Sequence, residues 1–181
     1  MKNRTPLLVL LFALALAACS TPPEPTSEAA PAAEAESTAA AEEAPAATIG
    51  EMKFPEGEVQ HAVYTEDIEW APCPAHLPPG CQLTVLEGSP KVADMFTVRF
   101  LADAGFFMPP HTHPKDERVT IISGQVAVAF GAGATREDAK VFGPGDYYVN
   151  KREEIHTVWA DSTSIIQITG IGPWKADFIE G

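Results

Sequence analysis

The chain has 181 residues and carries 12 Lys and Arg against 25 Asp and Glu, which gives a formal net charge of −13. Binding to phosphate backbones needs a basic face, so this acidic balance argues against a nucleic-acid partner.

The N-terminus has the pattern of a bacterial secretory signal. Lys2 and Arg4 precede an unbroken apolar run of twelve residues, 7–18. Such a run is too short to cross a bilayer as a helix and suits the core of a signal peptide. It ends in Leu16-Ala17-Ala18-Cys19, which resembles the lipobox of bacterial lipoproteins.

The lipobox resemblance implies that residues 1–18 are a signal peptide and that Cys19 becomes a lipid-bearing N-terminus. An ordinary signal peptide and an uncleaved anchor are the alternatives. Ser20 follows the cysteine, where an Asp would retain a lipoprotein in the inner membrane. The resemblance therefore favours the outer membrane, facing the periplasm, in a cell that has one.

Residues 19–50 form a predicted tether. They are almost wholly Ala, Pro, Glu, Ser and Thr, without an aromatic residue. Such a segment cannot bury enough apolar area to offset its ordering entropy, so we expect it to be disordered. About 30 flexible residues have a root-mean-square span of roughly 30 Å, which would let a folded domain stand off the membrane.

Two cysteines remain beyond the tether, Cys73 and Cys81, at the ends of a proline-rich stretch. An exported protein meets an oxidising compartment, so we expect a disulfide between them. The alternative is a pair of metal-bound thiolates. A zinc site of that kind needs two more ligands at short spacing, and only His76 lies in range.

The remaining residues, 51–181, are enough for one domain with a single core. Short runs rich in Val, Ile, Thr and aromatic residues alternate with Gly, Pro and Ser turns, which predicts an all-β sandwich or barrel. The expected strands are 82–87, 95–101, 119–123, 125–130, 147–149, 156–160, 164–169 and 176–179.

Three of the five histidines form a pattern with one glutamate, His111-x-His113-x-x-x-Glu117, followed later by His156. Imidazoles two residues apart on a strand point to the same face. Pro114 biases His113 toward extended backbone, which fixes that face. Neutral imidazole together with carboxylate suits divalent transition metals.

The spacing Gly105-x5-His111-x-His113-x3-Glu117-x6-Gly124 resembles the first motif of the cupin superfamily. Gly145 and His156 stand where the second cupin motif has a Gly and a His. The other three positions of that motif depart from the pattern: Lys151, Glu153 and Ala160 replace its Pro, second Gly and Asn.

The cupin resemblance implies a double-stranded β-helix, that is a jelly-roll barrel, over residues 51–181. It also implies one divalent metal ion held by His111, His113, Glu117 and His156. This ligand set fits Fe, Mn, Zn, Ni, Co and Cu, and the sequence does not choose among them. Runs 86–88, 117–120 and 170–174 are further similar to small bacterial cupins, including the metal-binding domain of the photooxidative-stress anti-sigma factor.

Strand alternation predicts which side chains share the barrel interior with the ligands. Phe107 and Pro109 should point inward with His111, and Val158 with His156. Gln167 and Thr169 are the expected inward polar residues of a late strand.

Two functions follow from the resemblance. One is a metal-dependent enzyme of dioxygenase or isomerase type acting on a small molecule, because such a ligand set leaves metal positions open to an oxygen donor. The other is a non-catalytic module of the cell envelope that binds or senses a metal or small ligand. The sequence identifies no general acid or base, and a homodimer stays an open alternative.

Overall fold

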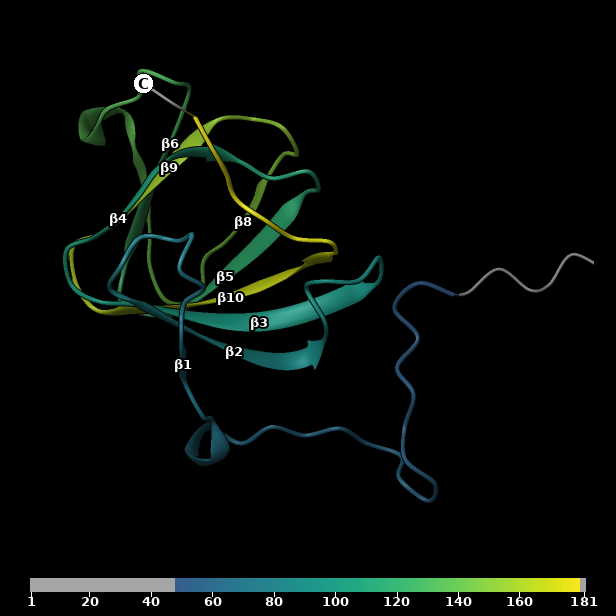
Figure 1. Cartoon of the computed structure of the whole chain (residues 1–181). Coiled ribbons are helices and arrows are strands. Elements are labelled where there is room, and N and C mark those ends of the chain that lie inside the picture. The colour runs from purple at the N-terminus through teal and green to yellow at the C-terminus, as the bar shows by residue number, and fades with distance from the viewer. Residues whose placement is uncertain (1–47, 180–181) are drawn as a thin grey trace, which may run out of the picture. The chain divides into compact units, whose positions relative to one another are not determined.

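The computed structural model describes residues 48–179, which are almost entirely β-structure (Figure 1). The predicted signal peptide, Cys19 and the tether up to residue 47 lie outside the described residues. Within the described part, no helix has the length and apolar character needed to cross a membrane. The elements are η1 (Thr65–Asp67), β1 (Ala71–Pro72), β2 (Cys81–Gly88), β3 (Met95–Ala102), β4 (Phe106–Thr112), β5 (Glu117–Ser123), β6 (Val126–Phe130), η2 (Arg136–Asp138), β7 (Lys140–Phe142), β8 (Tyr147–Asn150), β9 (His156–Ala160), β10 (Ser164–Ile171) and β11 (Asp177–Phe178).

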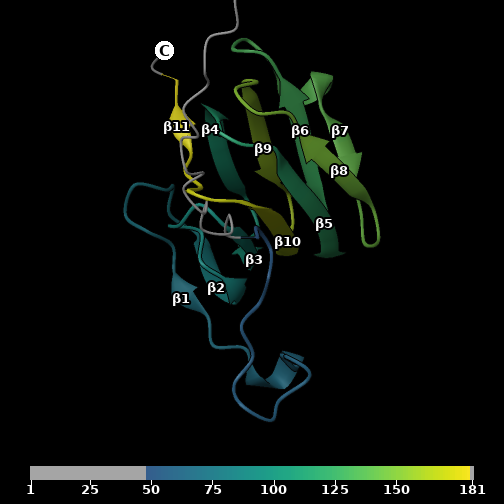
Figure 2. The same cartoon turned by 90° about the vertical axis from the view of Figure 1, so that its right-hand side faces the viewer.

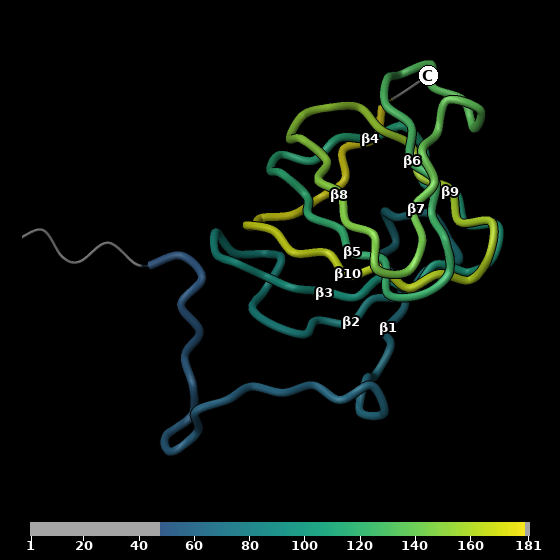
Figure 3. Tube along the Cα trace, turned by 180° about the vertical axis from the view of Figure 1, so that it is seen from behind, coloured from purple at the N-terminus to yellow at the C-terminus, as the bar shows by residue number. Residues whose placement is uncertain are grey.

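The strands form two antiparallel sheets. One has the order β1-β2-β3-β10-β5-β8 and the other β11-β4-β9-β6-β7. From β3 onward the chain crosses between the sheets at nearly every connection, and only β6 and β7 are consecutive in one sheet. The sheets face each other, with β2, β3 and β10 on one side and β4, β6 and β9 on the other (Figures 2 and 3). This is the predicted all-β jelly-roll barrel.

The core fills the space between the two sheets. On β3 the residues Phe96, Val98 and Phe100 alternate into it and are 0%, 2% and 5% exposed. Val119 and Ile121 enter it from β5 in the same way. Side chains alternate between the two faces of a strand, and this alternation, which predicted the strands, also places the apolar face of each strand against the opposite sheet.

The alternation prediction for β4 is wrong before His111. Phe107 is 44% exposed and packs against Trp159, while its neighbours Phe106 and Met108 are buried. The reason is a β-bulge. Met108 pairs with Val158 and His111 pairs with His156, so two residues of β4, Pro109 and Pro110, lie between pairs that are separated by a single residue on β9. The extra residue reverses the alternation, and the Pro109-Pro110 pair at the bulge has no N–H to lose from the ladder.

The prediction for the late strand is also wrong. On β10, Ile166 and Ile168 line the barrel interior, so Gln167 and Thr169 face outward. The Thr169 hydroxyl instead lies 3.2 Å from that of Thr97 on the outer face of the sheet. The apolar and polar residues of β10 alternate as expected, and the sequence alone assigned the polar set to the wrong side.

The predicted disulfide is confirmed. Cys73 and Cys81 are bonded, with their Cα atoms 5.6 Å apart. Cys81 is the first residue of β2, and its backbone carbonyl accepts the N–H of Cys73. The bond therefore closes the proline-rich loop onto the start of the sheet, next to the buried Leu77.

We expect the Cys73→Ala, Cys81→Ala double variant to lower the free energy of unfolding by about 2 kcal/mol. Loop-closure entropy alone would give about 2.5 kcal/mol, and the prolines already restrict the unfolded loop. Urea denaturation of oxidised wild type, reduced wild type and the double variant measures the difference. Equal midpoints for all three would contradict the prediction.

Candidate metal centre

Three imidazoles converge inside the barrel. His111 lies near the end of β4 directly opposite His156, the first residue of β9. His113 follows β4 by one residue. The three side chains are buried, and their candidate ligand nitrogens all lie within 4.8 Å of one another. These three histidines could hold a metal ion.

The backbone fixes the orientation of each ring. In every case Nδ1 lies within hydrogen-bonding distance of a carbonyl oxygen, which can only accept, so Nδ1 carries the proton. The acceptors are the carbonyls of Pro109 for His111 at 2.7 Å, Lys175 for His113 at 2.7 Å and Glu154 for His156 at 3.0 Å. This leaves the Nε2 atoms as the candidate ligand atoms, an arrangement that is common around metal-binding histidines.

The surroundings of one of these nitrogens show whether the site suits a cation. The Nε2 atom of His156 is buried and has no hydrogen-bond partner among the described residues. A buried polar atom without a partner is destabilising. A metal ion bound by the lone pair would remove that cost, so the donor set fits a metal.

Glu117, the fourth predicted residue, begins β5 and lies beside the imidazoles. Its Oε1 atom is 3.4 Å from Nε2 of His113, and its Oε2 atom is 4.0 Å from Nε2 of His156. The structure therefore brings all four sequence-predicted residues together, from β4, β5 and β9.

The protonation of these groups is coupled. Burial lowers the pKa of His111 to about 4, with repulsion from His156 and His113 as a further cause. Burial would raise the pKa of Glu117, but attraction and hydrogen bonding from His113 and the other imidazoles outweigh it and lower the pKa to about 2. At neutral pH the cluster thus holds an ionised carboxylate and at least one neutral imidazole, the forms that bind metals.

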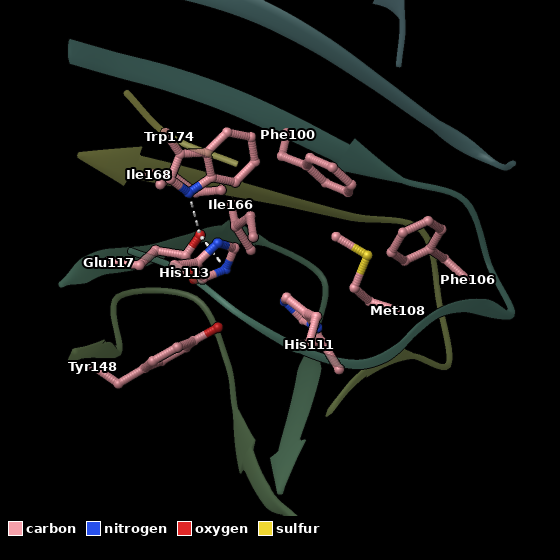
Figure 4. A pocket seen from close by; sticks show the side chains of 11 residues that line it. Phe100, Phe106, Met108, His111, His113, Glu117, Tyr148, Ile166, Ile168 and Trp174 are labelled. Atoms are coloured by element: carbon pink, nitrogen blue, oxygen red, sulfur yellow. Dashed lines mark hydrogen bonds and ion pairs between the residues drawn. The ribbon is translucent and has the colours of Figure 1, made fainter. Parts of the chain in front are cut away.

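Two residues that sequence reasoning missed hold the carboxylate in place. The indole Nε1 of Trp174 donates to Oε1 of Glu117 at 3.1 Å (Figure 4). The amide of Asn150 donates to Oε2 at 3.0 Å. Trp174 also stacks on His113, with ring centroids 5.4 Å apart. Trp174 belongs to the run 170–174 noted for its similarity to small cupins, whereas Asn150 carries no signal in the sequence.

The turn before His156 departs from the cupin motif, yet it keeps the conformation that the motif implies. Glu153 stands in the place of the second Gly and has a φ of 63°, in the left-handed region that favours glycine. Its N–H donates to the carbonyl of His113 at 2.8 Å. Arg152 pairs with Asp116 through its guanidinium and its backbone N–H. The two loops that carry the ligands are therefore joined to each other.

His111, His113 and Glu117 open onto a cavity of about 40 Å³, counted as the space available to the centre of a water molecule. That is room for a few water molecules or a small organic group. Its walls are mainly apolar and include Phe100, Phe106, Met108, Tyr148, Val158, Ile166, Ile168 and Trp174. The predicted inward position of Val158 is confirmed.

Comparison with known proteins gives a family match and a set of similar folds. Residues 58–175 match the family described as the ChrR cupin-like domain. An acetylacetone dioxygenase from Acinetobacter johnsonii has a TM-score of 0.54 at 20% identity and covers 72% of this chain and 85% of its own. The polyketide cyclase RemF from Streptomyces resistomycificus has a TM-score of 0.54 at 15% identity and covers 68% and 87%. At these identities the likeness shows the fold alone.

A curated relative matches a smaller part. The cytochrome c oxidase assembly protein ctaG of Reclinomonas americana is 28% identical over 89 residues, which cover 40% of this chain and 49% of that protein. The chain thus spans about half the length of the curated relative it matches.

The conformation of Glu153 generates a prediction. We expect Glu153→Gly to raise the free energy of unfolding by about 0.5 kcal/mol. Glycine adopts the left-handed conformation without the steric cost that a side chain brings, and this gain outweighs the larger conformational entropy that glycine gives the unfolded chain. Glu154→Gly is the matched control: Glu154 is not among the described residues with positive φ, so this change should lower stability by roughly 0.5–1 kcal/mol. Thermal and urea unfolding measure both variants. A destabilised Glu153→Gly protein would mean that the turn depends on the Glu side chain.

Proposed function

Because this chain belongs to the ChrR cupin-like domain family, we propose that it binds one divalent metal ion inside its barrel. The proposed ligands are the three imidazoles and the buried carboxylate, namely His111, His113, Glu117 and His156. The observation that carries the proposal is the orientation of the rings. Backbone carbonyls take every Nδ1 proton, the Nε2 atoms converge, and the buried Nε2 of His156 has no partner within residues 48–179. Fe, Mn, Zn, Ni, Co and Cu all suit such donors.

The chain's own residues would prepare the site for this ion. The three carbonyl contacts fix the orientation of the imidazole rings before metal arrives, and Trp174 and Asn150 orient the carboxylate. The apolar walls keep bulk water away from the site. A bound divalent ion would supply Lewis acidity toward an oxygen donor.

We propose that the site acts on a small molecule, with oxygenase- or isomerase-type chemistry. The size of the cavity supports a small substrate, and its apolar walls support chemistry away from bulk water. The fold neighbours include a dioxygenase and a cyclase, which is consistent with this class without specifying a reaction.

The second candidate is a non-catalytic module that binds or senses a metal or small ligand. One observation favours it: among the described residues that line the cavity, Tyr148 is the only ionisable residue apart from the proposed ligands. A general base outside the ligand set is therefore missing from the described cavity wall, whereas proton-transfer chemistry commonly needs one.

We also propose that the protein is lipid-anchored in the cell envelope, at the outer membrane facing the periplasm. The lipobox resemblance ending in Cys19 supports this, and so does the disulfide, because disulfides persist in exported proteins and are rare in the bacterial cytosol. Residues 19–50 would then separate the barrel from the membrane.

Metal stoichiometry tests the proposed site. Purified wild type should bind about one equivalent of divalent metal, and His111→Ala should weaken binding on the order of 100-fold or more, since losing an outer-sphere partner alone often costs 10–100-fold. His76→Ala, at an exposed loop position, is the matched control and should bind like wild type. Equal affinity in a folded His111→Ala protein, checked by circular dichroism, would exclude the assignment.

Oxygen uptake by the metal-loaded protein separates the two candidate functions. Small phenols, diketones and thiols are the first substrates to assay. Turnover that is lost in His111→Ala supports the enzyme, whereas full metal loading with no turnover across the panel favours the binding module.

The anchor has its own test. Cys19→Ala should abolish incorporation of a fatty-acid analogue, because the thioether to lipid needs that sulfur. Equal labelling of wild type and variant would end the lipoprotein proposal.

A further inference from the structure

The cavity has two chemically different ends. Toward one end lie the Glu117 carboxylate, His113 and the phenol of Tyr148, and toward the other lie Phe100, Phe106 and Met108 (Figure 4). His111 stands between the two groups. A ligand that fills this space therefore meets polar groups at its head and only carbon and sulfur atoms at its tail.

The charges of the lining also restrict the ligand. Among the described residues that line the cavity, none is Lys or Arg, and Glu117 is the only carboxylate. With a divalent ion in place, the ion, the carboxylate and neutral imidazoles sum to one positive charge. That charge balances one anionic group, and a second anionic group would lie against the apolar end, where a buried, unpaired charge is strongly disfavoured.

Tyr148 is the remaining polar group on the cavity wall. It lies on β8 and its ring packs against Phe142, with centroids 4.4 Å apart, which restricts its rotation. The hydroxyl points into the middle of the cavity, on the side where His111 lies, with Glu117 and His113 beside it (Figure 4). No hydrogen bond joins this hydroxyl to another residue in the described part of the chain, and its oxygen is not among the fully enclosed polar atoms. It is a donor that faces the ligand space without a partner.

The hydroxyl is a donor at neutral pH, because a phenol loses its proton only near about pH 10. A protonated phenol can donate to an anionic or carbonyl oxygen, and it has no cationic charge with which to bind a second carboxylate.

We propose that the site selects small monoanionic oxygen donors with a short apolar tail, and that the Tyr148 hydroxyl donates a hydrogen bond to the oxygen group at the metal. The inference rests on the proposed function, since the ion supplies the charge that the anion balances. Tyr148 is thereby a substrate-binding residue, and Phe100, Phe106 and Met108 enclose the tail.

Butyrate and succinate test the proposal, because both have four carbons and differ in the second carboxylate. The full-length chain, purified in detergent and loaded with Co(II), is titrated with each acid at neutral pH while the visible absorption of cobalt is recorded. Butyrate should bind at least tenfold more tightly than succinate. Tyr148→Phe should weaken butyrate about tenfold, as expected for a hydrogen bond to a charged group, with cobalt stoichiometry unchanged.

Tyr147→Phe is the matched control, because Tyr147 is the next residue in the chain and is 57% exposed. It should bind butyrate within twofold of wild type. Equal affinities for butyrate and succinate, or a Tyr148→Phe protein within twofold of wild type, would overturn the inference and leave the metal site intact. Failure of wild type to take up cobalt would instead overturn the proposed function, and this inference with it.

Discussion

A carboxylate buried inside an apolar barrel is the constraint on which the site depends. An ionised group in such surroundings is tolerated only when its oxygens are well paired. Glu117 meets this requirement through Trp174, Asn150 and the imidazole of His113. These contacts hold β8 and the segment around Trp174 against the ligand cluster.

The C-terminal segment also fixes the orientation of the ligand residues. Beyond Trp174, the carbonyl of Lys175 takes the Nδ1 proton of His113, and β11 pairs with the end of β4 at Thr112 and His111. Ligand orientation on β4 therefore depends on residues some sixty positions later in the chain. Such long-range dependence couples the geometry of the site to folding of the whole domain.

The positions that depart from the cupin motif show which features the site needs. Glu153 adopts the left-handed conformation without being glycine, and its N–H still binds the carbonyl of His113. The Arg152–Asp116 ion pair ties this turn to the neighbouring ligand loop. Backbone conformation at the turn is retained although the residue type has changed, because the hydrogen bonds that surround it hold the chain in place.

The sequence by itself predicted the strand-rich fold and the disulfide, since each depends on local spacing or on chemistry that residue type specifies, and the resemblance to cupins implied the barrel and the set of three histidines and one glutamate. His111 and His113 share a face because they are two apart, whatever the rest of the fold does. Only the tertiary structure decided the inward positions of Phe106 and Met108, because a bulge at Pro109-Pro110 reverses the alternation and depends on pairing with β9. It also decided that Gln167 and Thr169 face outward, since period two gives two faces without saying which one is buried. Asn150, Trp174 and Tyr148 reach the site through contacts between distant strands, and no local pattern in the sequence encodes such contacts.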